Sequence, residues 1–135
     1  MLNQDACIFY KNHTVYNDFG GVVLESQEAK HIAEAMGPTN RVIILKNHGL
    51  LTAGTNVGEA AYLLCLMDTY CEVQMQVDSV QPSGRYRRDV IPDQEAKYTY
   101  EMTASAENLY SSFCAYYEVE VVASNGAITS ATSYH

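Results

Sequence analysis

Apolar and polar positions change their spacing several times in the first third of the chain. The apolar run at 6–10 (ACIFY) predicts a buried strand. Segment 11–21 is polar and rich in turn-forming residues, so it predicts an irregular connection, with a short strand at 22–24 behind it. Helical spacing then predicts a helix over 27–36 that ends at Gly37-Pro38. Ser26 is its expected N-cap, and its apolar stripe consists of Ala29, Ile32, Ala33 and Met36.

The pattern becomes most regular after this helix. RVIILK (41–46) has consecutive apolar residues without alternation, which is typical of a strand covered on both faces. The triplet Asn47-His48-Gly49 interrupts the run, and LLTAG (50–54) continues as a second short strand. The sequence therefore predicts two strands joined at a histidine-glycine corner.

A long helix is expected next. Asn56 and Glu59 have the spacing of a capping box, in which the Asn side chain accepts from a first-turn N–H and the Glu reaches back. The helix is predicted from Val57 to about Val77. Its first half, AAYLLCLM (60–67), is apolar nearly all round, which predicts burial against the sheet.

The last third alternates between polar and apolar segments. Residues 81–95 have the composition of a mobile loop, and 106–116 predicts a helix capped by Ser105. EVEVVAS (118–124) alternates with period two and predicts an edge strand, while 125–135 is expected to be a flexible tail. This order of elements predicts an α/β fold, a mixed sheet flanked by helices, in a single domain over 1–124. The apolar side chains expected to line the last helix are Leu109, Phe113 and Tyr116.

Composition agrees with one globular domain and excludes several classes of partner. The chain has 135 residues, of which 47% are hydrophobic and 18% charged. The net charge of −8 argues against a nucleic-acid partner, and no apolar run is long enough to predict a membrane span. The first residues lack the pattern of a signal peptide, so a cytoplasmic location is expected.

The four cysteines fit neither a secreted disulfide framework nor a zinc-site spacing. Buried free thiols in a reducing compartment are therefore expected. The four are Cys7, Cys65, Cys71 and Cys114.

His48 is the sharpest candidate for chemistry. A histidine between a buried strand and a glycine can point its ring into a cleft, and Gly49 would allow a ligand or metal to approach closely. The alternative is that the ring hydrogen-bonds nearby backbone and only closes the corner. The residues alone leave both interpretations open.

The segment LKNHGLLTAGTNVGEAAYLL resembles the class II aldolase/adducin family. The matching features are an apolar strand, the histidine-glycine pair, a small-residue strand and a helix that opens with glutamate-alanine. The resemblance continues upstream to residue 4 and more weakly downstream to about residue 122, and it is strongest to the fungal adducin-like branch. It implies that the chain corresponds to the C-terminal part of the family domain and is N-terminally truncated relative to it. The matching residues are Ile43-Ile44-Leu45, His48-Gly49, Thr52-Ala53-Gly54 and Glu59-Ala60.

The resemblance implies that His48 is one of three histidines that hold a catalytic divalent metal, most often zinc. In the family the other two form a His-x-His motif, and a glutamate in a preceding segment is the acid/base. No such motif occurs here, since the other histidines are His13, His31 and His135. His31 is expected to be solvated. His13, Asn47 and Gly49 are candidate neighbours of the site, and the absence of any cofactor stays an alternative.

Two other groups of residues attract attention. Eleven tyrosines accompany no tryptophan, and Tyr110, Tyr116 and Tyr117 cluster near the end of the chain. The family places a tyrosine of a neighbouring subunit near the substrate, but no tyrosine here is assigned that role, and packing at a core or subunit rim is expected. The basic cluster 85–88 either attracts an anion or belongs to a solvated loop. Its members are Arg85, Arg87 and Arg88.

Three functions remain open at this point. The first is a metal-dependent carbon-carbon lyase that acts on a small carbonyl substrate, if the missing ligands are supplied. The second is a metal-free, adducin-like interaction module that binds actin or the cytoskeleton. The third is a metal-independent cyclase or lyase in a fungal biosynthetic pathway. Either Met1 begins a chain that associates into a homo-oligomer, such as a ring-like tetramer, or it lies inside a longer protein.

Overall fold

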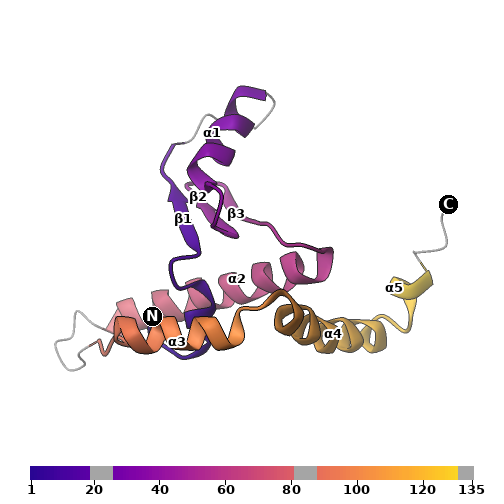
Figure 1. Ribbon diagram of the computed structural model, residues 1–135. Helices are drawn as coiled ribbons and strands as arrows, with labels where there is room; N and C mark the ends of the chain where they lie inside the picture. The colour runs from indigo at the N-terminus through magenta and orange to yellow at the C-terminus, as the bar shows by residue number, and fades with distance from the viewer. Residues whose placement is uncertain (19–25, 81–87, 131–135) are drawn as a thin grey trace.

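The structure is a computed structural model that describes residues 1–18, 26–80 and 88–130. Figure 1 shows a small sheet with helices on both sides and a helical arm that ends away from it. The elements in chain order are the 3-10 helix η1 (Asp5–Phe9), β1 (His13–Tyr16), α1 (Ser26–Met36), β2 (Val42–Leu45), β3 (Gly49–Thr52), α2 (Val57–Val80), α3 (Asp93–Thr103), α4 (Ala106–Ala123) and α5 (Ala127–Ser130).

The sheet is mixed and has the order β1-β2-β3. β1 runs parallel to β2, and β2 runs antiparallel to β3. Leu45 at the end of β2 lies opposite both Tyr16 and Gly49, so this end of the sheet is where the β2–β3 corner sits. The expected α/β fold with a mixed sheet flanked by helices is confirmed.

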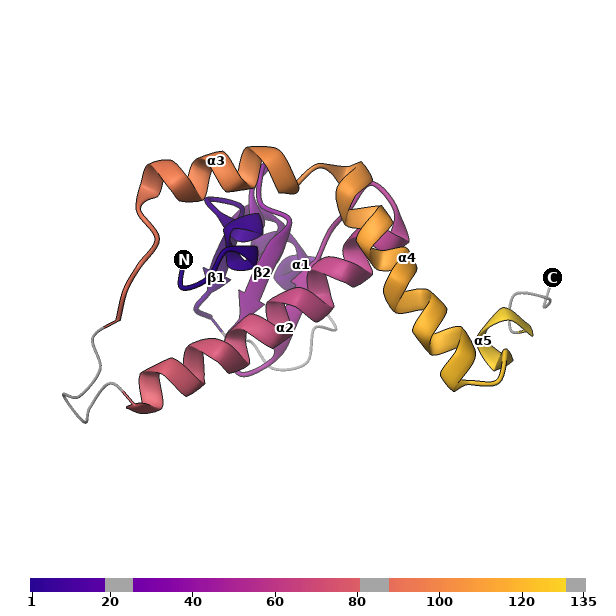
Figure 2. The same cartoon turned by 90° about the horizontal axis from the view of Figure 1, so that it is seen from below.

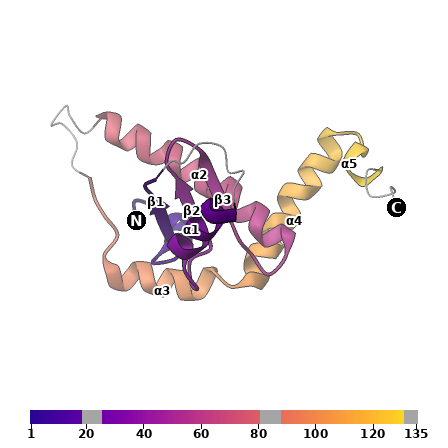
Figure 3. The ribbon, with the colours of Figure 1, turned by 90° about the horizontal axis from the view of Figure 1, so that it is seen from above.

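Each face of the sheet packs against different helices. Val42 is fully buried in a cluster with α2 and η1, whereas Ile43 is fully buried on the other face against Ile32 of α1. This confirms that the strand is covered on both faces, and Figure 3 shows α1 and α2 in different layers. The α2-side core consists of Ile8, Phe9, Val42, Leu63, Leu66, Met67, Ala104 and Leu109.

The prediction of a strand at 6–10 is wrong, because this segment forms most of η1. Short-range hydrogen bonds close it: the Ala6 N–H donates to Oδ1 of Asn3 at 2.8 Å, and the Cys7 N–H donates to the Gln4 carbonyl at 3.0 Å. Its apolar residues are buried as expected. A short apolar run does not distinguish a strand from a helical turn.

The irregular connection expected over 11–21 is also partly wrong, because it contains β1. β1 has a polar sequence because it lies at the edge of the described sheet and pairs only with β2. Its residue Val15 is 48% exposed. The strand expected at 22–24 lies outside the described residues.

The helix expected over 27–36 is confirmed as α1. Ile32 is buried and Met36 packs beside it, while Ala29 and Ala33 of the expected stripe are exposed. Gly37 ends the helix with φ 65°, in the left-handed region where glycine is favoured, and its N–H donates to the Ala33 carbonyl at 3.0 Å.

α2 extends three residues beyond its expected end and packs on the sheet through one side only. Leu63 and Met67 are buried, but Leu64 is 41% exposed and Cys65 is exposed. The expected burial of 60–67 against the sheet is confirmed for Leu63, Leu66 and Met67, which pack with Val42 of β2. An apolar side of α2 faces solvent in this chain.

The loop expected over 81–95 ends earlier than predicted. Residues 81–87 lie outside the described part of the chain, and α3 begins at Asp93. The start of α3 is held by the residue that follows η1, since the Tyr10 hydroxyl donates to Oδ2 of Asp93 at 2.6 Å. Ala96, in the first turn of α3, is buried.

The edge strand expected over 118–124 is wrong, because residues to Ala123 belong to α4. Ser105 caps this helix as expected, its Oγ accepting from the Asn108 N–H at 3.2 Å. Figures 1 and 2 show that α4 runs away from the sheet, so its last turns have no described strand to pair with. A helix satisfies its own backbone groups there. The flexible tail over 125–135 stays a prediction, and α5 gives part of it one helical turn.

The cysteines are free but mostly not buried. Only Cys7 is buried, Cys71 and Cys114 are half-buried, and Cys65 is exposed, which corrects the expectation of buried thiols. Within the described residues, every helix is too short or too polar to span a membrane.

Candidate functional site

His48 lies in the turn that joins β2 to β3. Its backbone N–H donates to the Leu45 carbonyl at 3.1 Å, and Leu45 pairs with Gly49 across the turn. The Lys46 N–H donates to the Tyr16 carbonyl at 3.0 Å, which fastens the turn to β1. The corner is therefore held from both neighbouring strands.

The identity of the residues beside His48 follows from the backbone of the turn. Asn47 has φ 57°, a left-handed conformation that asparagine tolerates better than most residues. Gly49 has φ 148°, where a side chain is strongly disfavoured. A Cβ added to Gly49 would meet no atom within 4 Å. The glycine is thus required by the backbone angle rather than by lack of space.

The imidazole of His48 is exposed, and no hydrogen bond joins it to the described residues. It is the backbone N–H, not the ring, that closes the turn. The ring nitrogens are therefore accessible to a group from outside the described chain.

The structure separates the candidate histidines. His13 lies opposite Val42 at the start of the paired strands, whereas His48 follows Leu45, which lies opposite Tyr16 at the other end. Three residues of strand separate the two ends, roughly 10 Å. His31 is exposed on α1, as expected, with Nδ1 3.9 Å from Oε2 of Glu28.

The described residues therefore do not assemble a metal site by themselves. They contain no group of three His, Cys, Asp or Glu side chains placed to hold an ion. His135 falls outside the described part. Of the expected neighbours, only Asn47 and Gly49 lie beside His48.

A buried ion pair at the opposite end of β2 from the corner was missed by the sequence analysis. Nη1 of Arg41, immediately before β2, contacts Oε1 of Glu59 in the first turn of α2. The Glu59 side chain is 1% exposed, and Nη2 of Arg41 donates to the Ala104 carbonyl at 3.1 Å. The guanidinium thereby connects the sheet, α2 and the α3–α4 junction.

Glu59 has a second role in capping α2. Asn56 accepts from the Glu59 N–H at 2.9 Å, as the capping box predicts. The Glu59 carboxylate, however, accepts from the N–H and hydroxyl of Thr55 at 2.7 and 2.8 Å. The prediction that it contacts the N–H of the N-cap Asn56 is therefore wrong, because its partner is the preceding residue. Burial would raise the pKa of the Glu59 carboxyl, but the Thr55 hydrogen bonds and the Arg41 charge outweigh burial and lower it.

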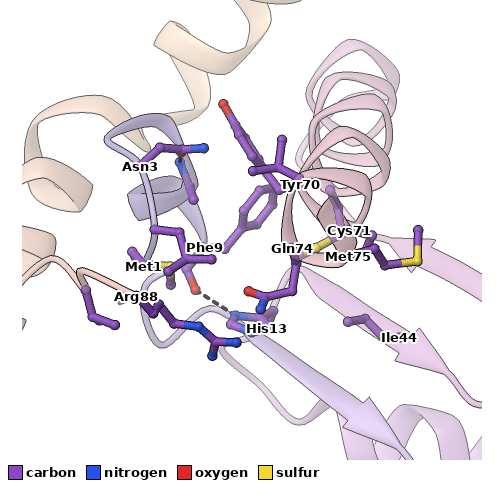
Figure 4. Close-up of a pocket in the computed structure, with 15 residues that line it drawn as sticks. Met1, Asn3, Phe9, His13, Ile44, Tyr70, Cys71, Gln74, Met75 and Arg88 are labelled. Carbon is purple, nitrogen blue, oxygen red and sulfur yellow. Dashed lines mark hydrogen bonds between the residues drawn. The ribbon is translucent and has the colours of Figure 1, made fainter. Parts of the chain in front are cut away.

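His13 lies elsewhere, at an apolar cavity of about 600 Å³ lined by η1, β1, β2 and α2. Figure 4 shows its ring beside the Gln74 amide, and Phe9 and Tyr70 also line the cavity. His48 does not line this cavity. The two histidines therefore belong to separate places in the fold.

Two tyrosines of α2 contact other parts of the described fold, whereas packing of the exposed Tyr110, Tyr116 and Tyr117 at a subunit rim stays a prediction. Tyr62 of α2 meets Tyr116 of α4 edge to face at 5.6 Å between ring centroids. The hydroxyl of Tyr70 donates to Oδ2 of Asp5 at 3.3 Å, and burial together with the Asp5 charge raises the pKa of Tyr70 to about 12. Of the basic cluster, Arg88 pairs with Asp78, and the other two arginines lie outside the described residues.

Comparisons with known proteins agree with this geometry. Residues 1–75 match the sequence profile described as "Class II Aldolase and Adducin N-terminal domain". The chain is similar to the Meiotically up-regulated gene 14 protein of Schizosaccharomyces pombe, with 38% identity over 95% of this chain and 49% of that protein. It is also similar to Decarboxylase NovR of Streptomyces niveus, with 42% identity over 58% of this chain and 28% of that protein.

A solved structure shows the same fold. L-fuculose 1-phosphate aldolase from Glaciozyma antarctica PI12 superposes with a TM-score of 0.77 and 25% identity, covering 92% of this chain and 44% of that one. The chain thus spans about half the length of the fission yeast relative and less of the other two.

Proposed function

The chain belongs to the class II aldolase and adducin family, and we propose on that premise that it works as a metal-dependent carbon-carbon lyase on a small carbonyl substrate. His48 is the residue assigned to the metal, as one ligand of a divalent ion, zinc in the first instance. The observation that carries the proposal is the presentation of this ring: it is exposed, held on a fastened turn and has no hydrogen-bond partner among the described residues.

The geometry of the corner supports a ligand role. A metal-binding histidine needs a fixed backbone and a free ring nitrogen, because the ion replaces the partner that a structural histidine would have. The hydrogen bonds of Lys46 and His48 fix the backbone. The superposed aldolase supports a lyase as the activity.

The described residues alone do not fit a complete metal centre. A catalytic zinc ion takes three protein ligands and keeps an open position, and this part of the chain offers one. The remaining ligands are assigned to a second chain or to residues outside those described. A bound ion would stabilise a developing enolate.

Metal analysis of the native protein tests the assignment. We expect a divalent ion that survives dialysis, measured by inductively coupled plasma mass spectrometry, and that is lost in His48→Ala. His31→Ala is the matched control, since His31 is an exposed histidine on α1. Intact mass of the same native sample identifies the chains that hold the ion.

Two results would remove the metal-dependent lyase. One is a folded native protein that takes up no divalent ion on titration with zinc, cobalt or manganese. The other is an ion content equal in His48→Ala and wild type.

A second candidate function is a metal-free interaction module that binds actin or copies of itself. It is favoured by apolar side chains that face solvent on α2 and α4, because exposed apolar surface marks interaction sites. Co-sedimentation with actin filaments and light scattering test it, and a monodisperse monomer that stays in the supernatant would contradict it. These exposed side chains are Val57, Leu64, Tyr110, Tyr116, Tyr117, Val119 and Val122.

A further inference from the structure

The apolar cavity beside His13 has the features of a small-molecule site that is distinct from the His48 corner. Its volume of about 600 Å³ falls within the range of ligand pockets. It lies on the α2 side of the sheet, where Ile44 of β2 contributes to its wall. Figure 4 shows side chains from η1, β1 and α2 converging on it.

The buried part of the cavity wall is apolar and suits a flat ligand. Phe9 and Met67 are 2% and 5% exposed, so they form a firm floor. Tyr70 stands edge to face with Phe9 at 6.4 Å between centroids. Aromatic rings and thioethers bind aromatic molecules well, since both are polarisable and offer large contact surfaces.

The polar end of the cavity has a defined hydrogen-bond direction. Nδ1 of His13 lies 2.8 Å from the Phe9 carbonyl oxygen. A carbonyl only accepts, so Nδ1 carries the proton, and Nε2 of the neutral ring has a free lone pair. The Gln74 amide lies next to this ring in Figure 4. His13 is therefore an oriented acceptor.

The charges at this end favour a neutral ligand over an anion. Arg88 is the sole Lys or Arg among the described residues that line the cavity, and it is paired with Asp78. An anion would have to compete with that carboxylate. A neutral hydroxyl needs only the acceptor that His13 provides.

We propose that this cavity binds a neutral, flat apolar molecule bearing one hydroxyl group, and that the hydroxyl donates its proton to a hydrogen bond with Nε2 of His13. The apolar body lies against Phe9 and Met67. His13 is a binding and orienting residue in this assignment, and no bond is made or broken.

Two matched probes test the hydrogen bond. 2-Naphthol has the hydroxyl and is neutral at pH 7, well below a phenolic pKa of about 10, whereas 2-methoxynaphthalene has the same body and cannot donate. In calorimetric titrations of the wild-type chain we expect 2-naphthol to bind about fivefold more tightly, the usual contribution of one neutral hydrogen bond.

Variants of His13 distinguish this hydrogen bond from nonspecific hydrophobic binding. His13→Leu should bind both probes equally, because it has no acceptor. His13→Gln should keep the preference for 2-naphthol, because its amide oxygen reaches close to the position of Nε2. His13 is exposed in the free chain, so we expect both variants to fold, which their circular dichroism spectra check.

Cysteine footprinting locates the bound probe. Cys71 lines the cavity and is half-buried, while Cys65 is exposed and does not line it. Saturating 2-naphthol should slow alkylation of Cys71 by iodoacetamide and leave Cys65 unchanged. The proposal is overturned by absent binding, by equal affinity of the two probes for wild type, or by a preference for 2-naphthol that survives in His13→Leu. Equal protection of both cysteines would also overturn it.

Discussion

Arg41 and Glu59 form an ion pair that joins the residue before β2 to the first turn of α2. The pair lies at the far end of β2 from His48, because β2 runs from Val42 to Leu45. One end of the strand is thus fixed by charge and the other by the backbone hydrogen bonds of the corner. The sheet that presents His48 depends on both.

We expect Glu59→Gln to destabilise the fold by about 3 kcal/mol, since removing one partner of a buried ion pair leaves the other charge poorly compensated. The amide retains some hydrogen bonds to Thr55 and Arg41, which keeps the loss moderate. Urea unfolding followed by circular dichroism measures it. Glu118→Gln makes the same charge change at an exposed site of α4 and should stay within about 0.5 kcal/mol. Equal losses in the two variants would show that the ion pair contributes nothing.

The same pair predicts the direction of the pH dependence. The pKa of Glu59 is lower in the folded state than its ordinary value of 4.5. Its stabilisation is therefore complete above pH 4.5 and is lost as the pH falls through the lower, folded pKa. We expect the difference in unfolding free energy between wild type and Glu59→Gln to be constant above that pH and to shrink below it. A difference that grows on acidification would contradict the assignment.

The sheet was predictable from sequence because burial on both faces leaves a clear signal. Val42 to Leu45 form an unbroken apolar run, and the corner after them contains the residues that left-handed backbone angles favour. β1 left no such signal, since Val15 is half exposed and the strand contains polar residues. The alternation at 118–124 was misleading because α4 has few neighbours there. Without a surface to pack against, its apolar residues need not follow the helical period.

The candidate site was predictable only in part, because contacts between distant residues are not visible in local patterns. His48 is recognisable from its own neighbours. The pairing of Arg41 with Glu59 spans 18 residues and depends on how α2 returns to the sheet. The separation of His13 from His48 follows from the parallel register of β1 and β2, which no spacing in the sequence encodes.

Gly58 of α2 is the contact point for α4, and we expect Gly58→Ala to destabilise the chain by about 1–2 kcal/mol. An added Cβ would lie 2.7 Å from Cδ1 of Phe113 and 2.8 Å from Cδ2 of Tyr110. Overpacking of this kind costs about 1–3 kcal/mol, and the better helix propensity of alanine returns up to about 1 kcal/mol. Chemical unfolding measures the net effect.

The matched control for Gly58→Ala is the same change in a Phe113→Leu background. The smaller side chain makes room for the Cβ, so the loss should fall or reverse sign. An equal loss in both backgrounds would place its cause outside the contact with Phe113.

Gly49→Ala tests the corner that presents His48. The φ of 148° at Gly49 is strongly disfavoured for alanine, and we expect a loss of about 1–3 kcal/mol although the added Cβ has free space. Gly37→Ala is the matched control, because Gly37 also has a positive φ of 65° and open space but lies at the end of α1. Both variants should lose stability in urea unfolding, with Gly37→Ala losing about 1 kcal/mol. Only Gly49→Ala should shift the imidazole resonances of His48 in a histidine-labelled sample, because only that change forces the turn to rearrange. Unchanged His48 resonances together with wild-type stability would mean that the backbone of the corner does not hold the ring in place.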